Sequence, residues 1–345
     1  MKVRILTHAP FVGGFGGLEH QAQGYVQILQ SKYDAAFLKR DEQDIDVLHI
    51  VGHRLPLNRY FFHNLKAKGV KVVLSPVFYT RPFDWRDFRR PAIFRFLTKI
   101  PYTQFKMRKE LRQSTDLILP NSQAEKDQLL QVFGKPNGRL EVLYNRIPQI
   151  DPNLADEEVL KKRNLQKHRY FVSISHIEPR KNTLNLIKAF LKFATKNPSY
   201  KLVLIGKMRW SFGNFFEEVQ KLLNEHSDKI IHIDGLEHWN KEFVSLLRYS
   251  KAHLLPSFLE TPWLSSLEAS SLGVPILIGN DEPVREVFWA WWVSVSPYSV
   301  QSVAQGIQKI SQSPYSQEMA KWIQSRYSKE VVGKRFLELY ESLQG

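Results

Sequence analysis

Residues 256–269 have the sequence P-S-F-L-E-T-P-W-L-S-S-L-E-A, and this stretch decides the fold of the second half of the chain. The apolar run 252–255 before it predicts a strand. Thr261 followed by Pro262 is typical of a helix start, because the Thr hydroxyl caps free N–H groups and Pro suits the first helical position. Gly273 predicts the end of that helix. The stretch is therefore a strand-to-helix turn of an open α/β sheet.

Two carboxylates, Glu260 and Glu268, lie at the mouth of this turn with seven residues between them. This is the carboxyl edge of the predicted sheet, where ligands bind in such folds. The pair suits a ligand rich in hydroxyl groups, such as a sugar and a ribose, because carboxylates accept strong hydrogen bonds. The spacing alone leaves a second interpretation open, in which Glu268 faces solvent and Glu260 helps to cap the helix.

Residues 256–269 resemble the E-x7-E signature of GT-B glycosyltransferases of family 4, which use nucleotide sugars and retain anomeric configuration. A second match, F-V-S-I-S-H-I-E-P-R-K-N at 171–182, is similar to the strand, loop and basic pair of the bacterial E-P-R-K-N branch. The two matches stand in the family's order and at its distance. The resemblance implies an α/β fold of two doubly wound, Rossmann-like parallel-sheet domains facing a cleft, which is the GT-B architecture.

Length and composition agree with two domains. The chain has 345 residues, of which 43% are hydrophobic, so it can bury sizeable cores. It contains no cysteine, which excludes disulfides and thiolate metal sites. Residues 3–6, Val-Arg-Ile-Leu, are too short for the core of a signal peptide, and no uncharged apolar run approaches the length of a membrane span. We therefore expect a soluble or peripheral protein.

Apolar strands alternate with helical periodicity along the chain, which predicts mostly parallel sheets covered on both faces. The predicted strands are 3–6, 47–51, 70–74, 117–119, 142–143, 170–174, 202–205, 230–233, 252–255 and 276–278. The polar stretch 149–167 is the predicted linker. We expect an acceptor-side domain over 1–150 and a nucleotide-sugar-binding domain over 151–327. By the resemblance, an amphipathic helix at about 328–345 returns to the first domain.

The basic pair Arg180 and Lys181 fits the chemistry of sugar transfer. Loss of a nucleoside diphosphate builds negative charge on phosphate oxygens, and fixed cations and helix N-termini stabilise that charge. Arg180 and Lys181 immediately precede a helix that we expect to begin at Asn182 or Thr183. The alternative is a solvated basic pair near a helix start, which the helix dipole slightly disfavours.

The resemblance also implies a role for each residue of the site. Glu268 would bind the ribose hydroxyls of the nucleotide, and Glu260 the hydroxyls of the transferred sugar. The backbone N–H groups of Trp263 and Leu264 would face the sugar or the diphosphate. Leu236 belongs to a turn that resembles the base-binding turn of the family.

A glycine-rich run at 13–17 resembles the loop that closes over the donor, which brings Gly16 and Gly17 into the predicted site. His176 stands where many members have a phosphate-binding Arg. His53 is the candidate for the histidine that the family often places near the reacting carbon. No metal or other cofactor is expected, because cationic side chains neutralise the diphosphate. The predicted catalytic residues are Glu260, Lys181, Arg180 and His53.

A strongly basic segment lies at 81–112, in a chain whose net charge is +15. It holds ten Lys and Arg against three Asp and Glu, interleaved with aromatic residues. An anionic membrane surface suits this composition best, because aromatics enter the interface while cations meet lipid phosphates. A solvated basic face over a packed aromatic core comes second. Nucleic acid comes last, and we do not expect it as a partner.

The resemblance implies a retaining hexosyltransferase. Its donor would be a nucleoside-diphosphate sugar, UDP- or GDP-linked, and its acceptor a lipid-linked or cell-surface saccharide, as in polysaccharide or lipopolysaccharide biosynthesis. We expect it in the cytoplasm, peripheral at the inner face of the membrane. Two alternatives belong to other classes: a nucleotide-sugar-binding GT-B protein with impaired catalysis, and a nucleic-acid-directed protein.

Overall fold

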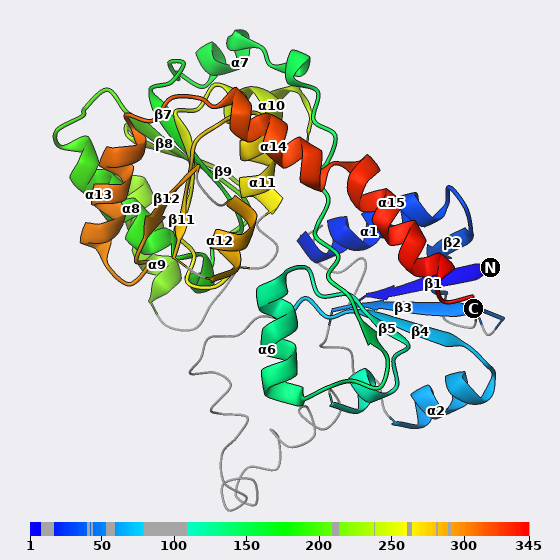
Figure 1. Cartoon of the computed structure of the whole chain (residues 1–345). Helices are drawn as coiled ribbons and strands as arrows, with labels where there is room; N and C mark the ends of the chain where they lie inside the picture. Colours follow the sequence, from blue (N-terminus) through cyan, green and yellow to red (C-terminus); the bar gives the residue numbers. More distant parts are fainter. Residues whose placement is uncertain are drawn as a thin grey trace, which may run out of the picture. The chain divides into compact units, whose positions relative to one another are not determined.

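The computed structural model describes residues 1–7, 17–39, 42, 44–52, 59–78, 109–208, 214–237, 239–260, 264–280, 282–288 and 291–344. For 59–62 and 282 it describes the backbone alone. The chain divides into two compact units, which are Met1–Arg146 with Lys329–Gly345, and Ile147–Ser328. Each unit is built around its own sheet (Figure 1).

The first unit has a six-stranded, wholly parallel sheet in the order β2-β1-β3-β4-β5-β6. Parallel strands need crossover connections, which the helices of the unit supply. The strands are β1 (Lys2–Thr7), β2 (Asp34–Phe37), β3 (Val47–Val51), β4 (Lys71–Ser75), β5 (Leu117–Ile118) and β6 (Arg139–Leu140).

Helices cover both faces of this sheet. Helices α1 (Gly17–Leu29) and α15 (Lys329–Glu341) pack on one face, and α2 (Arg59–Ala67) and α6 (Gln123–Phe133) on the other (Figure 1). The wholly buried strand β3 shows the alternation that results. Its Val47 and Val51 join the core under α1 and α15, while Leu48 and Ile50 join the opposite core.

The second unit repeats the plan with the strand order β12-β11-β10-β7-β8-β9, again wholly parallel. Helices α8 (Thr183–Ala194), α9 (Phe215–Glu225) and α13 (Val300–Ile310) pack on one face of it. The strands are β7 (Tyr170–Ile174), β8 (Lys201–Ile205), β9 (Ile230–Ile233), β10 (Ala252–Leu255), β11 (Ile276–Gly279) and β12 (Trp292–Val295).

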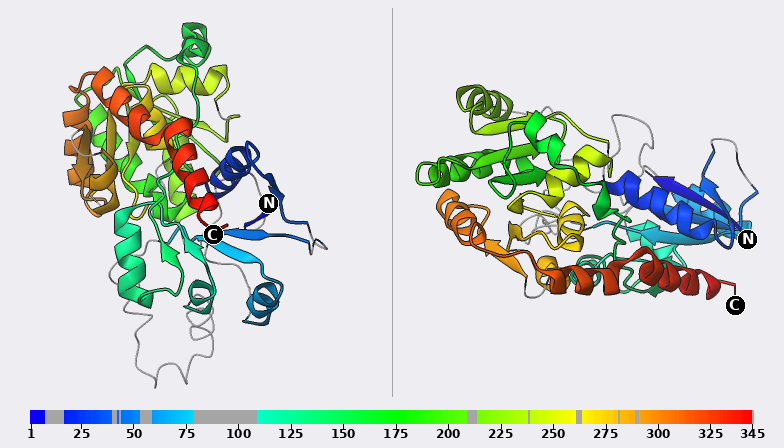
Figure 2. Two further views of the ribbon diagram at one scale, coloured as in Figure 1. Left: turned by 45° about the vertical axis from the view of Figure 1, so that its right-hand side comes forward. Right: turned by 90° about the horizontal axis from the view of Figure 1, so that it is seen from above.

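The opposite face of the second sheet carries α10 (Lys241–Arg248), α11 (Leu264–Ser271) and α14 (Gln317–Tyr327) (Figures 1 and 2). A further helix, α12 (Glu282–Phe288), connects β11 to β12. The α/β fold of two doubly wound parallel sheets is therefore confirmed. None of the helices in the described part of the chain has the length and apolarity that a membrane span requires.

The structure also corrects the predicted elements. Strands β2 and β12 were not predicted, and the predicted strand 142–143 is wrong, since β6 ends at Leu140. Leu143 is apolar because it packs in the core under α1 and α15. The predicted linker 149–167 contains two helical elements, a 3₁₀ turn (Pro152–Leu154) and α7 (Glu157–Lys162), which the side chains of Asp151 and Asp156 cap.

Candidate active site

The site begins with the pairing of two strands. Strands β7 and β10 are neighbours, with Ala252 opposite Phe171 and His253 opposite Val172. Because both strands are parallel, the loops that leave their carboxyl ends begin at the same edge of the sheet. The first loop leads through a 3₁₀ turn (Pro179–Lys181) into α8, and the second carries Glu260 toward α11.

Glu260 is buried, with 4% of its surface exposed, and it is surrounded by donors. Its Oε1 atom accepts hydrogen bonds from Lys181 Nζ, from Arg180 Nη1 at 3.4 Å and from Ser257 Oγ at 3.1 Å. The Lys181 side chain is itself only 13% exposed. A buried carboxylate needs such partners, because burial of an unpaired charge is costly. The structure thus brings together three residues that the sequence placed in one site.

The second oxygen of Glu260 has a different environment. All three donors reach Oε1, and no side chain or backbone group of the described residues donates to Oε2. A carboxylate offers about four lone-pair sites, so Oε2 can accept bonds from a ligand without loss of the contacts to Oε1.

Arg180 ties the two loops together. Its Nη1 also donates to the Leu259 carbonyl at 2.9 Å, and its Nη2 donates to Glu178 Oε1 at 2.8 Å. The backbone N–H of Phe258 donates to the Arg180 carbonyl at 3.0 Å. The guanidinium is therefore already oriented by protein contacts, which lowers the entropy cost of gripping a ligand anion.

Asn182 connects the loops that carry the site residues, and the sequence did not predict that role. It is buried and lies in the left-handed region with a φ of 61°. Its Nδ2 donates to the carbonyls of Pro256 at 2.9 Å and Pro297 at 2.7 Å. It thus joins the loops after β7, β10 and β12. The available signal was its residue type, since Asn adopts the left-handed conformation more readily than most residues.

Glu268 lies on α11 and is 3% exposed. This corrects the alternative in which it faces solvent. Its Oε1 accepts a hydrogen bond from the indole Nε1 of Trp239 at 3.1 Å. Burial raises the pKa of the Glu268 carboxyl to about 7, and the indole N–H opposes that rise. Trp239 was not predicted, and no local sequence pattern indicates its role, because the contact joins a loop residue to a helix residue 29 positions further along the chain.

His253 on β10 anchors α11. The backbone N–H of Ile174 reaches its Nε2 at 3.4 Å, and its Nδ1 lies 3.4 Å from Ser266 Oγ on α11. Burial, together with the nearby positive charge of Lys181, lowers the pKa of His253 to about 3. The ring is therefore neutral, and one tautomer satisfies both contacts. Its role is to position α11.

The other predicted site residues have varied positions. Leu264 begins α11, Leu236 lies in the β9–α10 loop, and His176 follows β7, each of them half-buried. Gly17 is the first residue of α1, in the first unit. The predictions for Gly16, His53, Trp263, Thr261 and Pro262 fall outside the described residues.

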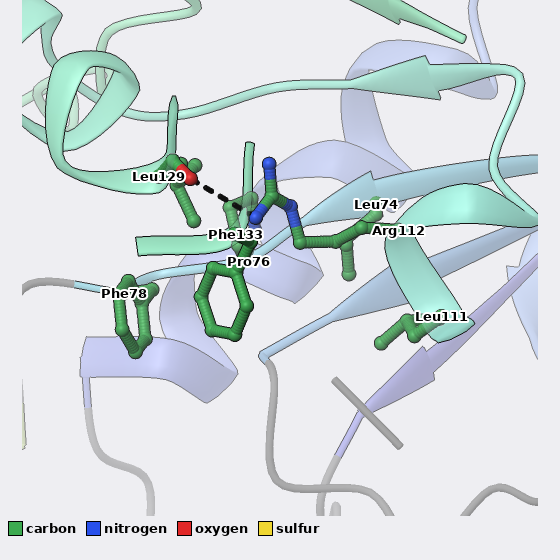
Figure 3. Close-up of a pocket in the computed structure, with 7 residues that line it drawn as sticks. All are labelled: Leu74, Pro76, Phe78, Leu111, Arg112, Leu129 and Phe133. Carbon is green, nitrogen blue, oxygen red and sulfur yellow. Dashed lines mark hydrogen bonds between the residues drawn. The ribbon is translucent and has the colours of Figure 1, made fainter. Parts of the chain in front are cut away.

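An apolar pocket lies in the first unit (Figure 3). Among the described residues that line it, Arg112 alone is charged. Arg112 donates to the Leu129 carbonyl at 3.1 Å, and its guanidinium carbon lies 4.7 Å from the Phe133 ring centre. Burial lowers the pKa of Arg112 to about 10. Arg112 and its neighbour Leu111 are core residues, which corrects the prediction that the membrane-facing segment extends to 112. Residues 81–108 of that segment lie outside the described residues.

Two doubly wound parallel sheets, with carboxylates and cations gathered at the carboxyl edge of the second, define the GT-B class of glycosyltransferases. Residues 155–329, about half of the chain, match the family described as Glycosyl transferases group 1. The chain belongs to this family.

Comparisons with individual proteins agree with that assignment. The chain is 26% identical over 224 residues to O-antigen chain mannosyltransferase B of Escherichia coli. That match covers 62% of this chain and 57% of the relative's length. Among solved structures, HepE of Anabaena in complex with UDP has a TM-score of 0.73, 13% identity and coverage of 99% of this chain and 100% of its own. Sucrose-phosphate synthase of Thermosynechococcus elongatus has a TM-score of 0.72, 13% identity and coverage of 99% of both chains. These structures show the same fold.

Proposed function

We propose that this protein is a retaining hexosyltransferase of family 4, in the E-P-R-K-N branch. It moves a hexose from a nucleoside-diphosphate sugar, UDP- or GDP-linked, to a lipid-linked or cell-surface saccharide. The observation that carries the proposal is the convergence of Lys181 and Arg180 on buried Glu260, just before α8 begins. The mannosyltransferase relative and the UDP complex of HepE support the class of substrate.

Lys181 and Arg180 are the residues proposed to bind the diphosphate. As the bond between the sugar C1 and the phosphate oxygen breaks, negative charge accumulates on that phosphate. Two cations held in position need little reorganisation to stabilise it, and the N-terminus of α8 adds its dipole. These cations make the proposed mechanism independent of a metal or other cofactor.

Glu260 is proposed to bind the transferred sugar. Its Oε1 is committed to the cations and Ser257, and its Oε2 accepts hydrogen bonds from sugar hydroxyls. One carboxylate therefore sets the position of the sugar relative to the phosphate-binding cations. Glu268 accepts the ribose hydroxyls in the same way. The remaining residues proposed for the donor site are Gly16, Gly17, His176, Leu236, Trp263 and Leu264, with His53 near the reacting carbon.

Retention of configuration follows from the proposed proton transfer. The acceptor hydroxyl oxygen forms the new bond to C1 on the face that the phosphate leaves, and its proton goes to the departing phosphate oxygen. The products are the glycosylated acceptor and the free nucleoside diphosphate. No enzyme base is needed for this step, because the leaving group takes the proton.

A thermal-shift screen with UDP, GDP, ADP and their sugars tests the donor class, since a ligand that binds the folded state raises apparent stability. We expect UDP or GDP and the matching sugar to raise the melting temperature. Hydrolysis or transfer from that sugar, followed as released nucleotide, then tests turnover. The anomeric configuration of the product tests retention. Binding without turnover would support the impaired-catalysis alternative, and binding of none of the ligands would contradict the proposal.

We propose that the protein acts at a membrane surface. The sequence supports it through the basic aromatic segment at 81–112, of which Leu111 and Arg112 are core residues. In this proposal the first unit serves the acceptor and the second unit binds the nucleotide sugar, with the protein peripheral on the cytoplasmic side.

A further inference from the structure

Trp239 lies in a conformation that a large residue seldom adopts. It belongs to the loop between β9 and α10, and its φ is 62°, in the left-handed region that Gly and Asn favour. A bulky residue keeps this backbone conformation only where surrounding contacts hold it there. The next residue, Asn240, is fixed as the cap of α10, because its side chain accepts the Phe243 N–H at 2.9 Å. The loop is thus built to place the indole.

The indole of Trp239 contacts the buried carboxylate of Glu268. Its Nε1 donates to Oε1 at 3.1 Å. No other hydrogen bond to this carboxylate comes from the described residues, and the cations Lys181 and Arg180 are paired with Glu260. A carboxylate that is 3% exposed and holds a single neutral donor is under-satisfied. Burial accordingly raises its pKa to about 7.

We infer that Trp239 is a positioning residue for nucleoside recognition: its indole N–H holds Glu268 Oε1 and directs Oε2 toward the hydroxyl pair of a ribose. This inference rests on the proposed function, which assigns the ribose to Glu268. A ribose supplies two adjacent hydroxyl donors, which is what an under-satisfied carboxylate lacks. The indole N–H is the protein's own donor to this carboxylate. It acts only as a donor, so it does not compete with Glu268 for the ribose hydroxyls.

Trp239 therefore acts on affinity for the nucleotide rather than on the bond that breaks. Glu268 touches the leaving nucleoside and not the sugar C1, so loss of its orientation raises KM for the donor and leaves kcat nearly unchanged. A residue that served only packing would change stability and leave donor affinity alone. A residue that blocked the site would, on removal of its N–H, tighten nucleotide binding.

The test is calorimetric titration of UDP, GDP and ADP into the parent, Trp239→Phe, Glu268→Gln and the double variant. Trp239→Phe keeps an aromatic ring and removes the N–H. We expect it to weaken binding of the preferred nucleotide about tenfold. In the Glu268→Gln background the same change should have little further effect, because the two residues act as one unit. Trp322→Phe on α14 is the matched control, since it removes an indole that packs on Trp291 and Tyr327.

A second measurement tests the contact without any nucleotide. In protein labelled with ¹⁵N-Trp, the Trp239 Nε1–H resonance is the one lost in Trp239→Phe, and it should move in Glu268→Gln. Equal nucleotide affinity of parent and Trp239→Phe, tighter binding by Trp239→Phe, or full additivity in the double variant would each overturn the inference while the proposed function stands. A parent that binds none of the three nucleotides would overturn both.

Discussion

At the scale of single residues, Lys181 is one of the two cations proposed to bind phosphate. Its ammonium group is mostly buried and lies against Glu260, so it is held in place before any ligand arrives. A Lys without such a partner would spend entropy to reach the same position. The contact also explains why a buried cation is tolerated in front of a helix N-terminus, where the dipole disfavours it.

Lys181→Ala should therefore weaken binding of the preferred nucleoside diphosphate by about ten- to a hundredfold, the usual cost of a hydrogen bond to a charged group. Calorimetric titration measures the change. Lys188→Ala on α8, the helix that follows Lys181, is a matched control, because Lys188 is exposed and pairs with Glu218. Equal affinity of Lys181→Ala and the parent would remove Lys181 from the site.

The raised pKa of Glu268 predicts that the stability of the folded protein depends on pH. Its pKa is raised from 4.5 to about 7 in the folded protein, so the unfolded chain ionises first as pH rises. The stability contribution is fully present below pH 4.5 and is lost as pH rises to about 7. The loss is at most about 3 kcal/mol.

The nucleotide-free Glu268→Gln variant should lose less stability than the parent between pH 5 and pH 8, measured by urea unfolding at each pH. The comparison with the parent is needed because burial also raises the pKa of Glu125 to about 8, which acts in the same direction. Parallel curves for parent and variant would show that Glu268 is not a buried carboxyl.

At the scale of elements, one asparagine orients three loops of the second unit. Asn182 Nδ2 donates to Pro256 and Pro297, and its left-handed backbone starts α8. Asn182→Gly removes the two bonds and keeps the backbone conformation, whereas Asn182→Ala removes the bonds and adds strain. We expect both variants to bind nucleotide more weakly, with the Gly variant about 1 kcal/mol more stable than the Ala variant. Urea unfolding gives this order, and the reverse order would contradict the conformation of Asn182.

The C-terminal helix is attached to the first sheet by a buried polar contact. The Tyr340 hydroxyl on α15 lies 2.8 Å from His49 Nδ1, and His49 Nε2 lies 2.9 Å from Ser75 Oγ. Burial lowers the pKa of His49 to about 3, so the ring is neutral. His49 is thus a structural histidine of the core.

Tyr340→Phe should destabilise the protein by about 1–2 kcal/mol, because it leaves a buried ring nitrogen without its partner. Chemical denaturation measures this, and nucleotide affinity should be unchanged, since the proposed donor residues belong mainly to the second unit. Tyr200→Phe is the control, because the hydroxyl of Tyr200 makes no hydrogen bond to the described residues while its ring packs on Phe171. Unchanged stability of Tyr340→Phe would show that α15 is held by packing alone.

At the scale of the whole molecule, net charge is the property that bears on location. Each basic side chain near an anionic membrane surface adds about 1 kcal/mol of attraction. Conversion of Arg86, Arg89, Arg90 and Arg95 to Gln should release the protein from anionic vesicles in a sedimentation assay and spare nucleotide binding. Arg112 is excluded from this set, because it is a core residue. Undiminished sedimentation would place the membrane contact elsewhere, and loss of nucleotide binding would mean that the segment supports the fold.

Local sequence determined much of the fold. Strands β3, β7, β9 and β10 lie at the predicted residues, because runs of apolar, mostly branched side chains specify buried strands. The edge strands β2 and β12 were not predicted. Their sequences, D-A-A-F and W-V-S-V, are short and lack a continuous branched run, so their pairing depends on the neighbouring strand.

In the candidate site, too, some features follow from local sequence and others from tertiary structure. The order of residues by itself placed Glu260 and Glu268 on one turn and Arg180 and Lys181 before one helix, because those relations are local. Only the tertiary structure decided that Lys181 meets Glu260 across 79 residues of chain, and that Trp239 meets Glu268. Such contacts depend on which strands become neighbours and how deeply each carboxylate is buried. Both are properties of the packed sheet and its helices, which no local pattern of residues encodes.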